Sequence, residues 1–188
     1  MQNQEATAVP LTLETTIGGH QLTLERLPQW EFHETGSKLL LTEHAHMLDE
    51  SIKPQGLLVS IFMPDEADLA LVAQAEDPCL ALMHHIVAIP GYVGSADVMA
   101  PTAFQWSEHN AAYYTLNDNQ GSVALVLAVC LQNGDIMVFN VSGPAAQAER
   151  LRSELPAILR TVQIEDEVLS GEGLDSLPNP LPFPPDEA

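Results

Sequence analysis

The sequence contains few positively charged residues: six Lys and Arg stand against 26 Asp and Glu, and the formal net charge is −20. Such a field repels the phosphates of nucleic acids and anionic membrane surfaces. The shortage of basic residues therefore excludes the basic stripe of a nucleic-acid-binding protein and removes the membrane surface as a partner. A basic partner protein or a cation is what this charge favours. Acidity that only maintains solubility explains the same composition.

Cysteines and long apolar runs are also scarce. Cys79 and Cys130 are the two cysteines, and both lie in apolar stretches. This placement favours buried, reduced thiols, and a disulfide between them stays open because sequence separation does not fix distance. The first residues lack the basic and apolar segments of a signal peptide, and no run approaches the roughly 18 apolar residues of a membrane span. These absences predict a soluble cytoplasmic protein.

The familiar catalytic motifs are missing as well. No nucleophile elbow, phosphate-binding loop, dinucleotide-binding, zinc-protease or C-x-x-C pattern occurs. Ser107, Glu108 and His109 are adjacent, but a catalytic triad is assembled in space, so adjacency does not indicate one. The sequence therefore predicts no catalytic residue and no cofactor.

Apolar residues with a period of two organise the body of the chain. Gly18-Gly19 and Asn133-Gly134 each separate two alternating runs, and residues of these types tolerate positive φ, so both pairs predict two-residue hairpins. Strands are expected over 57–63, 111–118, 123–132 and 135–141. The last three form an antiparallel meander.

Helices are expected within 66–87 and 144–160. Asp65 and Asp77 precede apolar residues at helical spacing and can accept backbone N–H bonds as N-caps, and Pro78 fits a first helical position. These helices interrupt the strands rather than alternate with them. The sequence therefore predicts an α+β fold, a layered α/β/α sandwich around a largely antiparallel sheet.

The composition changes at Glu165. From there to the end, seven acids and five prolines occur without Lys or Arg. Proline neither continues a helix nor joins a central strand, and like charges extend a chain. We therefore expect a single domain over residues 1–165 and a flexible, acidic, proline-rich tail over 166–188.

Two phrases and the order of the elements carry a family resemblance. The phrases are AAYYTL at 111–116 and the strand-to-helix turn VFNVSGP at 138–144. The stretches LPQWEFHETGSKLLLTEH, GLLVSIFMPD and ILRTVQI complete the order. Residues 20–165 thereby resemble the PsbP-like α/β/α sandwiches, which include photosystem II extrinsic subunits, the Ran-release factor and bacterial DcrB-type proteins. The resemblance implies a non-enzymatic interaction module, whose partners differ among members, and it transfers no binding residue to this chain.

Seven histidines raise the alternative of metal binding. His44 and His46 would share a face of an extended segment, and Glu43 precedes them directly. Imidazole and carboxylate suit zinc or nickel, whereas a defined site needs three or four converging ligands. A solvated polar loop explains the pair equally, so His44 and His46 are metal-ligand candidates without a complete ligand set.

The leading hypothesis is a non-enzymatic protein-interaction module whose partner is unknown and carries a basic face. Self-association would account for the same sequence features. It differs from binding to a basic partner in one respect, since only the basic partner predicts binding that weakens with salt. The alternative is a protein that binds a small molecule or a divalent metal, and an enzyme is the third hypothesis, because a site can be built from residues scattered in the sequence.

Overall fold

Two antiparallel sheets form the framework of the protein. The computed structural model describes residues 11–26, 29–35, 37–44, 55–89 and 93–185. The smaller sheet comprises, in spatial order, β1 (Leu11–Ile17), β2 (His20–Arg26), β11 (Thr161–Ile164) and β12 (Glu167–Ser170). The larger sheet comprises β3 (Glu31–Thr35), β4 (Lys38–Thr42), β5 (Leu58–Phe62), β10 (Ile136–Pro144), β9 (Ser122–Cys130), β8 (His109–Asn117) and β6 (Asp97–Val98), and β7 (Thr102–Trp106) also pairs with β8.

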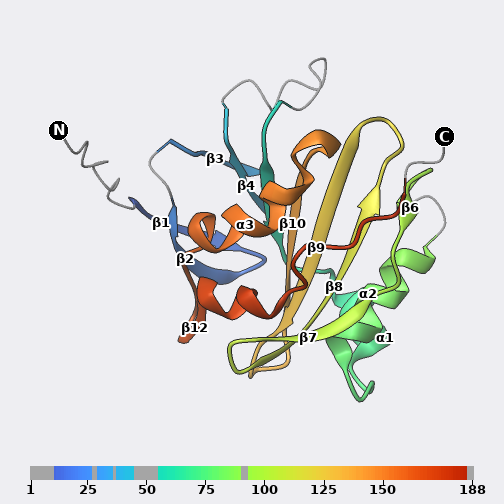
Figure 1. Ribbon diagram of the computed structural model, residues 1–188. Helices are drawn as coiled ribbons and strands as arrows, with labels where there is room; N and C mark the ends of the chain where they lie inside the picture. The colour runs from blue at the N-terminus through green and yellow to red at the C-terminus, as the bar shows by residue number, and fades with distance from the viewer. Residues whose placement is uncertain (1–10, 27–28, 36, 45–54, 90–92, 186–188) are drawn as a thin grey trace.

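Helices cover the larger sheet on both sides (Figure 1). The helices α1 (Glu66–Val72) and α2 (Pro78–Ala88) pack on one face of this sheet. The helix α3 (Ala148–Ile158), the smaller sheet and the 3-10 turn η3 (Gly171–Ser176) pack on the other face. The predicted layered α+β fold is thereby confirmed. Within the described ranges, no helix has the length and apolar character needed to cross a membrane.

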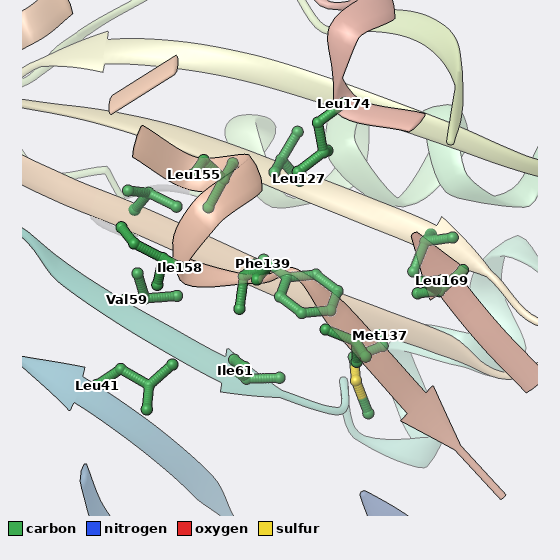
Figure 2. Close-up of a cluster of buried hydrophobic side chains, with 14 of the residues drawn as sticks. Leu41, Val59, Ile61, Leu127, Met137, Phe139, Leu155, Ile158, Leu169 and Leu174 are labelled. Carbon is green, nitrogen blue, oxygen red and sulfur yellow. The ribbon is translucent and has the colours of Figure 1, made fainter. Parts of the chain in front are cut away.

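The alternation of side chains along β9 supplies a core to each layer. Leu125 and Leu127 face α3 and the smaller sheet, whereas Val126 and Ala128 face α1 and α2, and all four are buried. A strand covered on both faces is apolar throughout, which is why β9 lacks a polar face. Figure 2 shows the core on the α3 side, where side chains of β4, β5, β9, α3, β12 and η3 gather around Phe139 of β10.

The turns and helix ends form where the local sequence predicts them. Gly18 and Gly19 have φ of 58° and 89° and connect β1 to β2, and Gly134 has φ of 92° in the β9–β10 turn. Asp65 and Asp77 cap α1 and α2, since each side chain accepts a backbone N–H at 2.9 Å. The expected strands correspond to β5, β8, β9 and β10.

The interpretation of the two cysteines as reduced thiols is wrong for this structure. Cys79 in the first turn of α2 and Cys130 at the end of β9 form a disulfide, with their Cα atoms 5.9 Å apart. Both residues belong to the core between α2 and the larger sheet. The two cysteines are 51 residues apart in the sequence, and they come together only because α2 packs across β8 and β9. The sequence therefore did not indicate that they are close.

The segment after Glu165 also differs from the expected flexible tail. β12 pairs with β11, and the buried side chains of Leu174, Leu177 and Leu181 join the core on the α3 side. Five prolines do not oppose this packing, because the chain after η3 is extended and contributes carbonyl groups rather than N–H groups. The acidic, proline-rich composition of the segment did not indicate that its leucines attach it to the core.

Side chains of the body hold the extended segment by its carbonyl oxygens. Arg152 of α3 donates to the carbonyls of Asp175, Leu177 and Pro178 at 3.0 to 3.3 Å. Thr115 of β8 donates to the carbonyl of Pro182. The segment to residue 185 therefore packs against the body, and the boundary expected at residue 165 does not coincide with an end of the fold.

Candidate functional site

The positive charges are unevenly distributed along the chain. No Lys or Arg occurs in residues 54–149, whereas ten Asp and Glu do. This stretch supplies β5 to β10, α1 and α2, so the layer formed by α1 and α2 has acidic but no basic residues other than histidine. The acids of this layer are Asp65, Glu66, Asp68, Glu76 and Asp77. The layer is therefore a surface on which a positively charged partner is favoured.

A groove opens at the edge of this layer, between α1 and the β9–β10 turn. Its volume is about 420 Å³. We call it the α1 groove, and it is lined on the helical side by Glu66, Leu69, Ala70, Val72, Ala73 and Pro78, and on the turn side by Asn133, Gly134, Asp135 and Ile136. Val72 and Ile136 are buried at its base, while Glu66 and Asp135 place a carboxylate on each side. The α1 groove thus combines an apolar base with an acidic rim.

The disulfide connects the two sides of the α1 groove. Cys79 directly follows Pro78 on the helical side, and Cys130 lies shortly before Asn133 on the turn side. The caps at Asp65 and Asp77 fix where each helix begins. The groove is therefore bounded by elements that are held by a covalent bond and by side-chain hydrogen bonds.

The turn side is held by hydrogen bonds around Asp135. Asn133 donates from Nδ2 to Asp135 Oδ2 at 2.7 Å and accepts the Asp135 N–H through Oδ1 at 2.9 Å. His20 Nε2 of β2 lies 3.3 Å from the same Asp135 Oδ2, and His20 Nδ1 lies 3.9 Å from Glu165 Oε1. These contacts orient the Asp135 carboxylate at the rim.

A second, more polar hollow lies beside the β7–β8 and β11–β12 turns. His109 is its buried histidine, and His109 Nδ1 lies 3.2 Å from the Cys130 carbonyl oxygen and 3.5 Å from Glu167 Oε2. The Glu167 carboxylate accepts the Gln132 N–H at 2.9 and 3.0 Å. The ring nitrogen nearest to these oxygens, Nδ1, therefore connects β8 to β9 and β12.

The basic residues of α3 are engaged in internal contacts. Arg150 Nη2 lies 2.7 Å from Glu43 Oε1, and Arg150 Nε lies 2.6 Å from Glu154 Oε1. Burial by itself raises the pKa of Glu43. Hydrogen bonds from Arg150 and from the Leu57 N–H act in the opposite direction and prevail, so the pKa of Glu43 lies below its ordinary value. Hydrogen bonds to Glu154 and Glu43 raise the pKa of Arg150.

The metal-ligand candidates are only partly covered by the structure. His44 lies exposed just after β4, and His46 lies outside the described residues. No group of three or more His, Cys, Asp or Glu with metal-binding geometry occurs in the part of the chain that the structure describes. Metal binding by His44 and His46 stays a prediction.

The α1 groove was not predictable from the sequence, although the helix and the turn that form its two sides were. Leu69 and Val72 fitted the apolar stripe of a helix, and Asn133-Gly134 fitted a hairpin turn. Nothing in the sequence indicates that these segments lie next to each other. The absence of Lys and Arg from residues 54–149 is the signal that could have identified the acidic layer.

A comparison with a solved structure supports the fold. The solution structure of cyanobacterial PsbP (CyanoP) from Synechocystis aligns over 87% of this chain and 97% of its own, with 12% identity and a TM-score of 0.51. This chain has a PsbP-like fold. The Ran-binding protein Mog1p of Saccharomyces cerevisiae aligns over 78% of this chain and 84% of its own, with 10% identity and a TM-score of 0.45. No family model and no curated protein matches the chain.

Proposed function

We propose that this protein is a protein-interaction module whose acidic layer, formed by α1 and α2, binds a basic partner. The observation that carries the proposal is the absence of Lys and Arg from residues 54–149, alongside ten acids in the same stretch. Arg150 and Arg152 do not offset this charge on the surface of the layer, because they belong to α3 and bind Glu43, Glu154 and backbone carbonyls.

The charge acts mainly on the encounter between the two proteins. Complementary potentials raise association rates and reject partners of like charge, and their effect falls as salt shortens the Debye length. With a net charge of −20, the protein repels nucleic acid and anionic membranes. A basic protein is therefore the class of macromolecule that this surface favours, and a second copy of the acidic layer is disfavoured.

Capture from a native lysate with matched charge variants tests the proposal. The double variant Glu66→Gln/Glu76→Gln removes two charges from the acidic layer, and Glu14→Gln/Glu31→Gln removes two exposed charges from β1 and β3. We expect one basic protein whose recovery falls with the first variant and at high salt, and is retained by the second. Equal recovery with both variants, or recovery that salt does not change, would contradict the proposal.

The α1 groove also favours a second candidate function, the binding of a small molecule. Its volume of about 420 Å³ lies within the range of ligand pockets, roughly 300 to 1,000 Å³. A small cationic molecule with an apolar body would match the base and the rim. A thermal-shift screen of hydrophobic amines, with neutral isosteres as controls, tests this alternative, and stabilisation by the amines alone is its expected result.

The cytoplasmic location stays a prediction, and the disulfide favours the opposite. Disulfides persist mainly in oxidising compartments and are uncommon in reducing ones. Acid quenching of intact cells, followed by alkylation of the denatured protein because Cys79 is fully buried in the fold, distinguishes the two. Resistance of Cys79 and Cys130 to the reagent until reductant is added is expected in an oxidising compartment, and immediate labelling is expected in the cytoplasm.

A further inference from the structure

We infer that the α1 groove is an anchor site for one large apolar side chain of the partner, flanked in the partner sequence by Lys or Arg. This inference rests on the proposed function, because it assumes that the acidic layer binds a basic protein. It adds the place on the layer where the partner is fixed and the sequence pattern that fits there.

The base and the size of the α1 groove match a single apolar side chain. Val72 and Ile136 are almost fully buried at the base, and the partly exposed Leu69 and Pro78 extend this apolar surface. The groove residues Ala70 and Ala73 have small side chains, and open space lies beyond Gly134, where a Cβ atom would meet nothing within 4 Å. Small residues around an apolar base leave room for a leucine, methionine or phenylalanine.

The rim determines which residues flank the anchor. Glu66 belongs to α1 and Asp135 to the β9–β10 turn, so the two carboxylates lie on opposite sides of the groove. Asn133 and His20 orient the Asp135 carboxylate. An anchor residue with Lys or Arg on either side can therefore place one positive charge near each carboxylate.

Charge identifies a basic partner as the occupant rather than a second copy of this chain. A second copy docking through the same layer would bring acids against acids, because this layer contains no Lys or Arg. The groove is also bounded by elements joined through the Cys79–Cys130 disulfide. Because its walls are already fixed, the groove loses little conformational freedom on binding, and this favours its use as an anchor site.

Three short peptides test the inference on the isotope-labelled whole protein. Ac-Gly-Arg-Leu-Arg-Gly-amide carries the anchor and both charges, a second peptide replaces Leu by Ala, and a third replaces both Arg by Glu. At low ionic strength, we expect the first peptide to shift the amide resonances of Ala70, Ala73, Gly134 and Asp135 most strongly. Loss of the apolar anchor should weaken binding about tenfold, and the acidic peptide should not bind.

Two tryptophan variants of α1 provide the matched control. Ala70→Trp fills the α1 groove, whereas Leu71→Trp places the same side chain on a residue that does not line the groove and is 68% exposed. Neither variant changes the charge. We expect Ala70→Trp to weaken binding of the leucine peptide at least tenfold and Leu71→Trp to leave it within about twofold.

Equal affinity for the leucine and alanine peptides overturns the inference, as does unchanged binding to Ala70→Trp. Amide shifts spread over the acidic surface without concentration at the groove also overturn it. These outcomes leave the proposed function standing if lysate capture still finds a basic protein that the acidic-layer variant releases. Failure of the proposed function is seen separately, as capture that neither salt nor Glu66→Gln/Glu76→Gln changes.

Discussion

The two sides of the larger sheet use charge in opposite ways. On the α3 side, Arg150 and Arg152 contact carboxylates and carbonyls of the protein itself. On the α1 and α2 side, no Lys or Arg is present in the helical layer, and the disulfide joins that layer to the sheet. Positive charge therefore stabilises the fold on one side, and negative charge is left at the surface on the other.

Two of the six basic residues of this chain, whose net charge is −20, make stabilising contacts on the α3 side of the larger sheet. Arg150 and Arg152 each bind several oxygens, and this concentrates their effect at the places where distant segments meet. The helical layer lacks such cations and depends on its apolar core and the disulfide. We expect the two sides to respond differently to reduction, to loss of an arginine and to added charge.

The largest expected effect is on the helical layer. Removal of the disulfide in Cys79→Ser/Cys130→Ser should lower the free energy of unfolding by about 4 kcal/mol, because the bond closes a loop across a 51-residue separation. Urea unfolding of the oxidised, reduced and variant proteins measures this loss. If reductant leaves the unfolding midpoint of the wild type unchanged, the covalent link does not stabilise this layer.

The second-largest loss of stability is expected on the α3 side. Arg152→Met should lower the free energy of unfolding by about 3 kcal/mol and expose residues 175–185 to protease, because it removes the donor to three backbone carbonyls. Limited proteolysis followed by mass spectrometry locates the cuts. Arg160→Met, which removes an exposed arginine just beyond α3, is the matched control and should change stability by less than about 0.5 kcal/mol.

Early cleavage after residue 165 in the wild type would contradict the packed arrangement and restore the flexible tail that the composition predicts. Resistance of this segment in the wild type, together with cleavage in Arg152→Met, would show that the arginine attaches it. The two results are distinct because the leucines of the segment are unchanged in the variant.

A smaller effect is expected at the Glu43–Arg150 pair. Arg150→Met should lower the free energy of unfolding by about 2 kcal/mol at neutral pH. The pKa of Glu43 is lower in the folded protein than its ordinary value of 4.5, so the pairing stabilises the protein above that pH. This stabilisation is lost as the pH falls through the folded pKa of Glu43.

The pH dependence provides the control for this pair. The difference in stability between wild type and Arg150→Met should become smaller in acid. When both proteins also carry Glu43→Gln, the difference between them should be smaller at every pH. Chemical unfolding of both single variants and of the double variant, over a series of pH values, measures the coupling between the two residues. A difference that stays constant with pH would assign the effect to packing of the arginine stem.

Local chemistry was predictable from the sequence, whereas contacts between distant segments were not. The hairpin turns at Gly18-Gly19 and Asn133-Gly134 depend on residues within each turn, and the caps at Asp65 and Asp77 depend on the next three residues. These features, with the order of the elements, were sufficient for the layered fold. Each was determined within a few residues of chain.

The disulfide, the packed segment after residue 165 and the α1 groove depend instead on tertiary packing. Cys79 meets Cys130 only because α2 lies across β8 and β9. Acids and prolines dominate the composition after residue 165, so the composition did not indicate that Leu174 and Leu177 pack into the core. The apolar spacing of these two leucines was nevertheless present in the sequence. The α1 groove required α1 to lie beside the β9–β10 turn, and hydrophobic patterns do not specify which surfaces become neighbours.

The smallest expected effect compares added positive charge on the two sides. Glu76→Lys places a lysine in the acidic layer beside Asp77, and Glu149→Lys places one at the start of α3 near Arg150 and Arg152. In the acidic layer the substitution relieves repulsion between like charges, so we expect stabilisation of about 0.5 kcal/mol that disappears at high salt. Both substitutions place a lysine near the positive end of a helix, α2 or α3, but only at the start of α3 does the lysine also meet existing arginines, so we expect a slight destabilisation of similar size there. Thermal unfolding of both variants at low and high salt measures the difference. Equal shifts for the two variants would mean that charge is balanced similarly on the two sides, and the comparison between them would fail.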